Sequence, residues 1–137
     1  MIKKLVGFLT VLCMAFFIAG CSSTPDMSGT YMLFNSDNNE PSNAIVISHV
    51  SDNVYEYTRY FVGAQSHKMV EMEKRRVIFK PEEKILQSQS DPFYKLFLNK
   101  DYTVITTIGR SISGANKEFN YKKLSDSEIK QYQHLFE

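Results

Sequence analysis

From residue 29 onward, apolar and β-branched positions come in short runs, separated by polar segments rich in Asn, Asp, Ser, Gly and Pro. Such runs between turn-forming residues are typical of β-strands. The run 67–80 is long enough for one bent strand or for two short ones. The predicted strands cover residues 29–34, 44–50, 54–62, 67–80, 85–89, 93–98, 102–108 and 118–123.

The hydrophobic period changes near the C-terminal end. Ser125 and Glu128 have the spacing of a capping box, in which each side chain accepts a hydrogen bond from the other residue's backbone N–H. The apolar residues that follow fall on one side of a helix: Ile129, Tyr132, Leu135 and Phe136. The sequence therefore predicts one helix over about 126–136, short enough to need packing against the sheet.

Seven to nine short strands joined by turns and followed by one helix indicate a mainly β domain. Consecutive hairpins favour an antiparallel meander, either closed as a small barrel or folded as a sandwich, with one C-terminal α-helix. One face of strand 54–62 holds Tyr55, Tyr57 and Arg59. The other holds Tyr60 and further apolar residues, so the sequence leaves open which face is buried.

The first 20 residues have a different pattern. Two lysines precede an almost continuous apolar run, which is the layout of a secretory signal peptide. The run ends in Ile18-Ala19-Gly20-Cys21, which resembles the lipobox of bacterial lipoproteins. An ordinary signal peptide with a chance cysteine is the alternative.

The resemblance implies that cleavage precedes Cys21, that its sulfur carries a diacylglycerol, and that the new amine is usually acylated, with palmitate as the expected acyl group. Two or three acyl chains attach a protein firmly to a membrane, whereas one is marginal. Ser22 stands where lipoproteins retained in the inner membrane carry Asp. The resemblance therefore implies the outer membrane, with the periplasmic face expected and the cell surface left open. We divide the chain into a signal peptide (1–20), a lipidated cysteine with a short tether (21–28) and one globular domain (29–137).

The expected mature chain has balanced charge. Two of the 16 Lys and Arg residues lie in the signal peptide, which leaves 14 against 15 Asp and Glu residues. This balance argues against a nucleic-acid partner. Cys21 is the one cysteine of the mature chain, so its lipidation leaves neither a disulfide nor a free thiol for redox or nucleophilic chemistry.

The mature part is rich in Tyr and Phe and contains no Trp. Its opening Gly29-Thr30-Tyr31 and its late helix are similar to small lipocalin-like barrels, which usually open with Gly-x-Trp. This resemblance concerns shape, and it implies a barrel able to enclose an apolar ligand.

The sequence offers no catalytic or metal-binding motif. His49, His67 and His134 lack the spacing of metal ligands. Ser48 and His49 would point to opposite faces of a strand, whereas a triad needs a hydrogen-bonded Ser–His pair. We therefore expect no enzyme activity, no metal and no cofactor, with a pair of carboxylates on facing strands as the minor catalytic alternative.

The candidate binding residues are aromatic and cationic. Tyr55, Tyr57 and Tyr60 flank Arg59, and Tyr and Arg are enriched at interface hot spots. Packing within the core is the alternative role for these rings. Arg110, in a Gly- and Ser-rich segment, is a candidate rim contact.

Charged residues cluster over 71–76. Glu71, Glu73 and Arg75 would share one strand face, which we interpret as solvated outer surface with cross-strand ion pairs. A patch for an anionic ligand or for a partner is the alternative.

These features predict a non-catalytic outer-membrane lipoprotein, anchored through Cys21, that binds a protein partner or an envelope component close to the membrane. The alternative is a small lipocalin-like barrel that binds a lipid or another apolar ligand. A cavity lined by Tyr and Phe would support the alternative.

Overall fold

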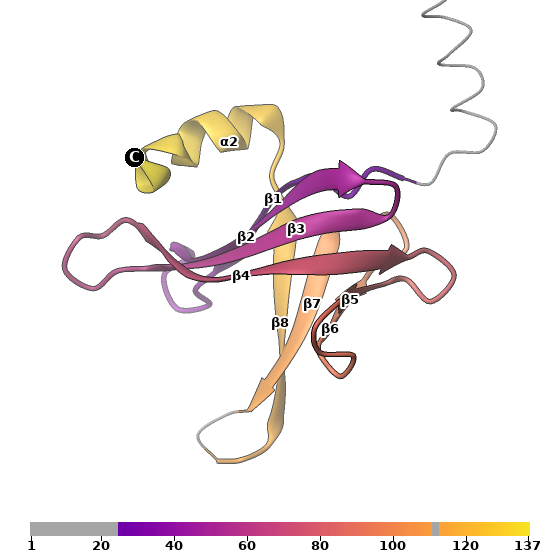
Figure 1. The fold of residues 1–137 in the computed structure, drawn as a ribbon. Helices are drawn as coiled ribbons and strands as arrows, with labels where there is room; N and C mark the ends of the chain where they lie inside the picture. The colour runs from indigo at the N-terminus through magenta and orange to yellow at the C-terminus, as the bar shows by residue number, and fades with distance from the viewer. Residues whose placement is uncertain (1–24, 111–112) are drawn as a thin grey trace, which may run out of the picture.

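The computed structural model describes residues 25–110 and 113–137, without the side chain of Arg110. Eight strands and two short helical segments follow one another along the chain (Figure 1). The strands are β1 (Gly29–Phe34), β2 (Pro41–Ser51), β3 (Val54–Val62), β4 (Met69–Lys80), β5 (Ile85–Ser88), β6 (Lys95–Leu98), β7 (Val104–Arg110) and β8 (Asn116–Lys123). The helical segments are α2 (Asp126–Tyr132) and the 3₁₀ helix η1 (Gln133–Phe136).

Each strand pairs antiparallel with its neighbour in the sequence, and β1 also pairs with β8, so the sheet closes into a barrel. The closing contact is short, with Tyr31 opposite Lys123 and Met32 opposite Lys122. The expectation of a mainly β antiparallel meander with one C-terminal helix is confirmed. Of the two forms that the sequence allowed, the barrel is the one adopted.

Two strands begin later than the hydrophobic pattern indicates. Phe93 and Tyr94 precede β6 in a turn, where the Asp91 carboxylate accepts a hydrogen bond from the Phe93 N–H (3.1 Å). β7 begins at Val104, whose N–H donates to the side-chain oxygen of Asn99 (2.9 Å). Hydrogen bonds from Asp and Asn side chains to the nearby backbone favour turns over strands. As a result β6 is only four residues long.

Aromatic and branched side chains fill most of the barrel interior. Successive residues of a strand point to opposite faces, so alternate positions of each strand point inward. In β3 the inward face is the one that carries Tyr55, Tyr57 and Arg59. The largest fully buried side chains include those of Tyr31, Tyr57, Phe79, Met27, Ile45 and Leu86.

The chain enters the barrel at the end where β1 begins, and this end is closed. Met27, two residues before β1, is fully buried. Its N–H donates to the Tyr55 hydroxyl (3.3 Å), and its carbonyl accepts from the Tyr31 hydroxyl (3.1 Å). In the same cluster, the Phe79 ring packs edge-on against Tyr55 and Tyr102, with centroids 6.4 and 5.7 Å apart.

The segments α2 and η1 lie across the outside of the barrel (Figure 1). The predicted capping box is present, because the Glu128 N–H donates to the Ser125 hydroxyl (3.3 Å) and the Ser125 N–H donates to the Glu128 carboxylate (3.0 Å). The chain then continues past Tyr132 as the 3₁₀ turn. The Phe136 ring packs edge-on against Tyr60 of β3, 5.3 Å between centroids. The helical segments therefore pack on the outside of the barrel, against Phe34 of β1 and Tyr60 of β3.

Candidate binding cleft

The end of the barrel opposite to the chain entry is open. β5 and β6 do not extend to it, so within the described chain residues 69–75 of β4 pair with β3 alone, and residues 107–110 of β7 pair with β8 alone. The β3–β4 and β7–β8 hairpins diverge there (Figure 1). A cleft of about 480 Å³ lies at this end. Small-molecule sites typically have volumes of about 300–1,000 Å³.

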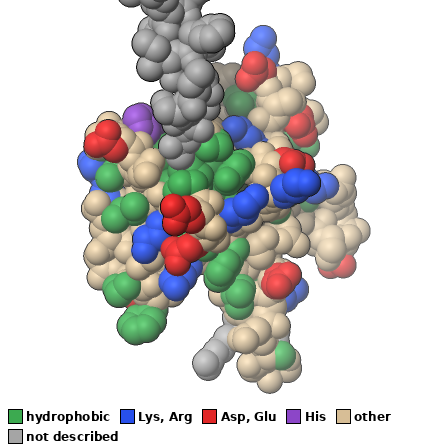
Figure 2. All heavy atoms as spheres, turned by 90° about the vertical axis from the view of Figure 1, so that its right-hand side faces the viewer, with side chains coloured by type: hydrophobic (Ala, Val, Ile, Leu, Met, Phe, Trp, Pro, Cys, Tyr) green, Lys and Arg blue, Asp and Glu red, His purple; other side chains and the backbone are tan. Residues whose placement is uncertain are grey.

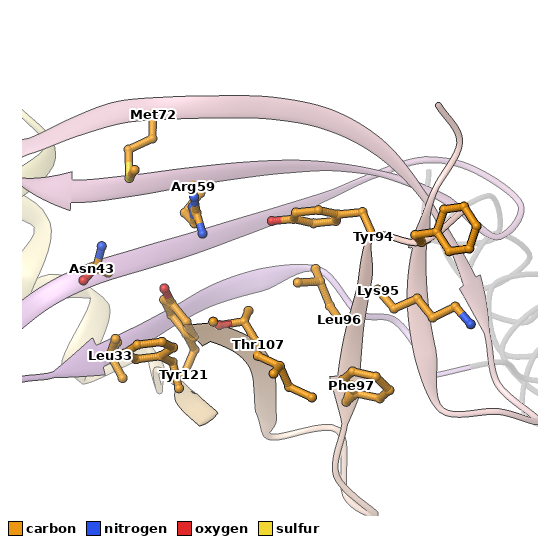
Figure 3. Close-up of a pocket in the computed structure, with 14 residues that line it drawn as sticks. Leu33, Asn43, Arg59, Met72, Tyr94, Lys95, Leu96, Phe97, Thr107 and Tyr121 are labelled. Carbon is orange, nitrogen blue, oxygen red and sulfur yellow. The ribbon is translucent and has the colours of Figure 1, made fainter. Parts of the chain in front are cut away.

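Apolar and aromatic side chains line most of the cleft, and residues from both hairpins face it (Figure 3). Arg59 and Lys95 are its cationic lining residues, and no carboxylate of the described residues lines it. The Phe119 ring lies against Gly109, where an added Cβ would come within 2.9 Å of the ring. Other apolar and aromatic lining residues include Leu33, Met72, Leu96 and Tyr121.

Next to the cleft, inside the barrel, the Glu73 carboxylate accepts hydrogen bonds from three side chains. Its Oε1 accepts from the hydroxyls of Tyr94 (2.8 Å) and Tyr57 (3.3 Å). Its Oε2 accepts from Nη2 and Nε of Arg75 (3.3 and 3.4 Å). The Arg75 guanidinium also lies over the Tyr94 ring, 4.0 Å from its centroid. Both carboxylate oxygens are therefore engaged.

Arg59 faces the same carboxylate without a hydrogen bond to it. The distance from Arg59 Nε to Glu73 Oε1 is 3.7 Å. Among the described residues, Arg59 Nε is the buried side-chain nitrogen or oxygen that has no hydrogen-bond partner. A buried donor without an acceptor costs about 1–3 kcal/mol, and more when it is charged. The residue that extends into the cleft thus has unused capacity to donate.

Burial and hydrogen bonds set the protonation states of this cluster. Burial raises the pKa of the Glu73 carboxyl, but the Tyr94 hydrogen bond and the charges of Arg59 and Arg75 outweigh it and leave the pKa below its ordinary value. Burial raises the pKa of the Tyr57 and Tyr94 hydroxyls. At neutral pH the cluster therefore holds one carboxylate, two guanidinium cations and neutral hydroxyl donors.

Replacing Glu73 by glutamine is expected to weaken the acid dependence of stability. Because folding lowers the pKa of Glu73, its stabilisation is complete above the ordinary carboxyl pKa of about 4.3 and is lost as the pH falls through the lower folded-state pKa. We expect Glu73→Gln to lose about 1–2 kcal/mol at neutral pH, since the partly exposed carboxylate retains some contact with water. Its free energy of unfolding should then fall less steeply below about pH 4.5.

Urea denaturation of both proteins across the acid range measures this difference. Glu71→Gln is the matched control, because the exposed Glu71 carboxylate lies 3.7 Å from the Lys74 ammonium on the same strand. The control should follow the wild-type profile. Equal profiles for all three proteins would contradict the described role of Glu73.

The structure places the candidate binding residues predicted from the sequence at different positions in the barrel. Tyr57 and Arg59 lie together next to the cleft. Tyr55 lies at the closed end and is bonded there to the backbone N–H of Met27, and Tyr60 lies outside the barrel beneath η1. The backbone of Arg110 belongs to the last part of β7, and its side chain lies outside the described residues.

The interpretation of the 71–76 cluster as one solvated outer face is wrong for two of its members. Glu73 and Arg75 are partly buried, and both bind groups inside the barrel. The cause is an irregularity of the β3–β4 register, which places Arg59 opposite Glu73 but the next residue, Tyr60, opposite Glu71. This bulge takes Glu71 out of the face that Glu73 and Arg75 share.

Sequence reasoning missed several residues at this end. Phe119 and Tyr121 alternate within a predicted strand, and that alternation was a usable signal for a shared inward face. Tyr94 lies in the turn before β6, where no periodicity marks the direction of a side chain.

The described residues contain no group of three or more His, Cys, Asp and Glu side chains able to hold a metal. Within residues 25–110 and 113–137, no helix has both the length and the apolar character needed to cross a membrane. Cys21 and the predicted signal peptide lie outside the described residues.

The surface on the right-hand side of Figure 1 carries mixed charge. Lysines, arginines, aspartates and glutamates alternate there with small groups of hydrophobic side chains (Figure 2). This face therefore has no single dominant charge. The cleft differs from this surface, because among the described residues its lining includes cationic side chains but no anionic ones.

Comparisons of the chain with protein-family models, with curated proteins and with solved structures find no match.

Proposed function

We propose that this chain is a lipid-anchored protein of the bacterial outer membrane whose barrel binds a small apolar or amphipathic molecule. The observation that supports this function most is the cleft of about 480 Å³ with its largely apolar and aromatic lining. Pockets of this size with few polar groups are typical of small-molecule binding. In this proposal the protein binds without catalysis, because the ionised groups beside the cleft engage one another rather than forming an acid–base pair.

The proposed anchor is a lipidated Cys21, supported by the lipobox-like residues before it, and Ser22 favours the outer membrane. The described chain enters the barrel at its closed end, and the cleft lies at the opposite end. In the proposed arrangement the cleft therefore opens away from the membrane that holds the anchor. A ligand would then arrive from the aqueous side.

A protein partner is the second candidate, because large apolar side chains are exposed around the cleft. Phe93 is 93% exposed, Ile108 53% and Met72 48%. Exposed apolar groups gathered at one place are typical of binding surfaces for proteins as well as for small ligands. The experiment below separates the two candidates.

The test is native mass spectrometry of the full lipidated protein, extracted gently from its own membrane. We expect a bound small-molecule mass on the wild type, and at least a tenfold lower occupancy on Thr107→Trp, whose indole would fill the cleft beside Thr107. Thr106→Trp is the matched control, because Thr106 is on the opposite face of the same strand and bonds Asn120 there (2.6 Å).

Equal occupancy on both tryptophan variants would contradict the cleft as the site. A wild-type protein that carries no small molecule but retains a second protein would favour the partner candidate instead.

A further inference from the structure

We propose that the ligand of the cleft is an amphipathic anion, an apolar molecule with one carboxylate or phosphate head, and that Arg59 binds this head. The inference rests on the proposed function and specifies its ligand class. It comes from three observations at the open end of the barrel. The Glu73 carboxylate already accepts hydrogen bonds from other side chains, the Arg59 guanidinium has N–H groups without acceptors, and the cleft is lined by cationic but not by anionic residues of the described chain.

The carboxylate nearest to Arg59, that of Glu73, already accepts hydrogen bonds from other side chains. Tyr57, Tyr94 and Arg75 donate to both oxygens of Glu73 at 2.8–3.4 Å, while Arg59 Nε remains 3.7 Å from the nearer oxygen. The carboxylate thus holds Arg59 by charge but does not satisfy its N–H groups. Nε is itself closed to a ligand, but 29% of the Arg59 side chain is exposed, so the other N–H groups of its guanidinium are available to a ligand oxygen.

The charges around Arg59 favour an anion over a cation or a neutral molecule. Arg59 and Arg75 carry two positive charges against the single charge of Glu73. Lys95 also lines the cleft, but its ammonium group points away from Arg59 (Figure 3). Carboxylates of the described residues are absent from the lining, and the one beside it, Glu73, is outnumbered by Arg59 and Arg75, so the charge next to the cleft remains positive. The planar guanidinium suits carboxylate and phosphate, because it can donate two parallel hydrogen bonds to either.

The apolar residues that line the cleft indicate that the rest of the ligand is an apolar tail. Arg59 projects from β3, and across the cleft lie Leu96 and Thr107 (Figure 3). Leu96 is buried, and the partly buried Leu33 and Phe119 pack against the same core and also line the cleft, so an apolar surface runs from the interior to the opening. A molecule with its head on Arg59 would therefore place an apolar tail along this surface. Burial of apolar area would stabilise the tail, and the ion pair would orient the head.

The test compares dodecanoate, dodecyl phosphate and dodecanol, which differ only in the head. Binding is measured by calorimetry on the full lipidated chain in neutral phosphatidylcholine nanodiscs, with empty nanodiscs as the blank. We expect both anions to bind about tenfold to a hundredfold more tightly than dodecanol. Arg59→Met should remove this difference, and Arg59→Lys should retain part of it. Arg76→Met removes the same charge from the exposed outer face of β4 and should behave as wild type.

Each outcome bears on one proposal. Equal binding of dodecanol and the two anions to the wild type would overturn the anionic head, while the apolar site would stand. A difference that survives Arg59→Met would overturn the role of Arg59. Absence of binding of all three probes would overturn the amphipathic ligand, and a co-purified apolar molecule sensitive to Thr107→Trp would still support the proposed function.

Nanodiscs of phosphatidylglycerol distinguish the source of the head, because competition by this lipid would identify a membrane headgroup rather than a free amphiphile.

Discussion

Replacement of Phe79 by alanine is expected to lower the free energy of unfolding by about 3–5 kcal/mol. Phe79 is 1% exposed and packs against Tyr55 and Tyr102 at the closed end. Removing the ring deletes its apolar burial and leaves a cavity that the strands of a closed barrel cannot easily collapse into. Urea denaturation of the wild type and the variant at neutral pH measures the change.

Phe93→Ala is the matched control for Phe79→Ala. The same side chain is removed, but Phe93 is 93% exposed, so its loss should alter the free energy of unfolding by no more than about 0.5 kcal/mol. A similar cost for the two variants would contradict the packed closed end. A large cost for Phe93→Ala alone would show that the open end, rather than the closed end around Met27, stabilises the barrel.

Replacement of Cys21 by serine is expected to abolish acylation, because the proposed thioether to diacylglycerol requires the cysteine sulfur. Intact mass spectrometry should show the loss of the acyl mass together with retention of residues 1–20. Each buried CH₂ of an acyl chain contributes about 0.8 kcal/mol to membrane binding. The loss of two or three chains would therefore convert firm attachment into attachment that depends on the uncleaved signal peptide alone.

Cys13→Ser is the matched control, since Cys13 lies in the apolar run expected to be removed. This variant should give the wild-type mature mass and fractionate with the outer membrane. Wild-type protein without an acyl mass at Cys21 would overturn the proposed anchor. Acylated protein recovered from the inner membrane would overturn only the location inferred from Ser22.

The proposals for the anchor and for the cleft are experimentally independent. The anchor concerns residues that precede the described barrel, and the cleft lies at the end away from Met27. A cleft variant such as Thr107→Trp should therefore leave acylation unchanged, while Cys21→Ser should leave the cleft intact. Failure of one proposal would not remove the support for the other.

The amino-acid sequence by itself determined the strands, the turns and the capped helix. These are local properties, since they depend on β-branched and aromatic runs, on Asn- and Asp-rich breaks and on the Ser125–Glu128 spacing. Strand ends were less well predicted, because the side chains of Asp91 and Asn99 bond to the nearby backbone and extend the turns.

Only the tertiary structure decided the closure of the sheet and the contents of the cleft. Both faces of β3 are partly apolar, so alternation alone could not show that Tyr57 and Arg59 point inward while Tyr60 packs beneath η1. Charged groups can occupy a barrel interior only where opposite charges or hydrogen-bond partners lie next to them. The partner of Arg59 depends on the β3–β4 register and its bulge, which place Glu73 opposite it. That register is set by pairing between segments distant in sequence, and no local pattern of residues encodes it.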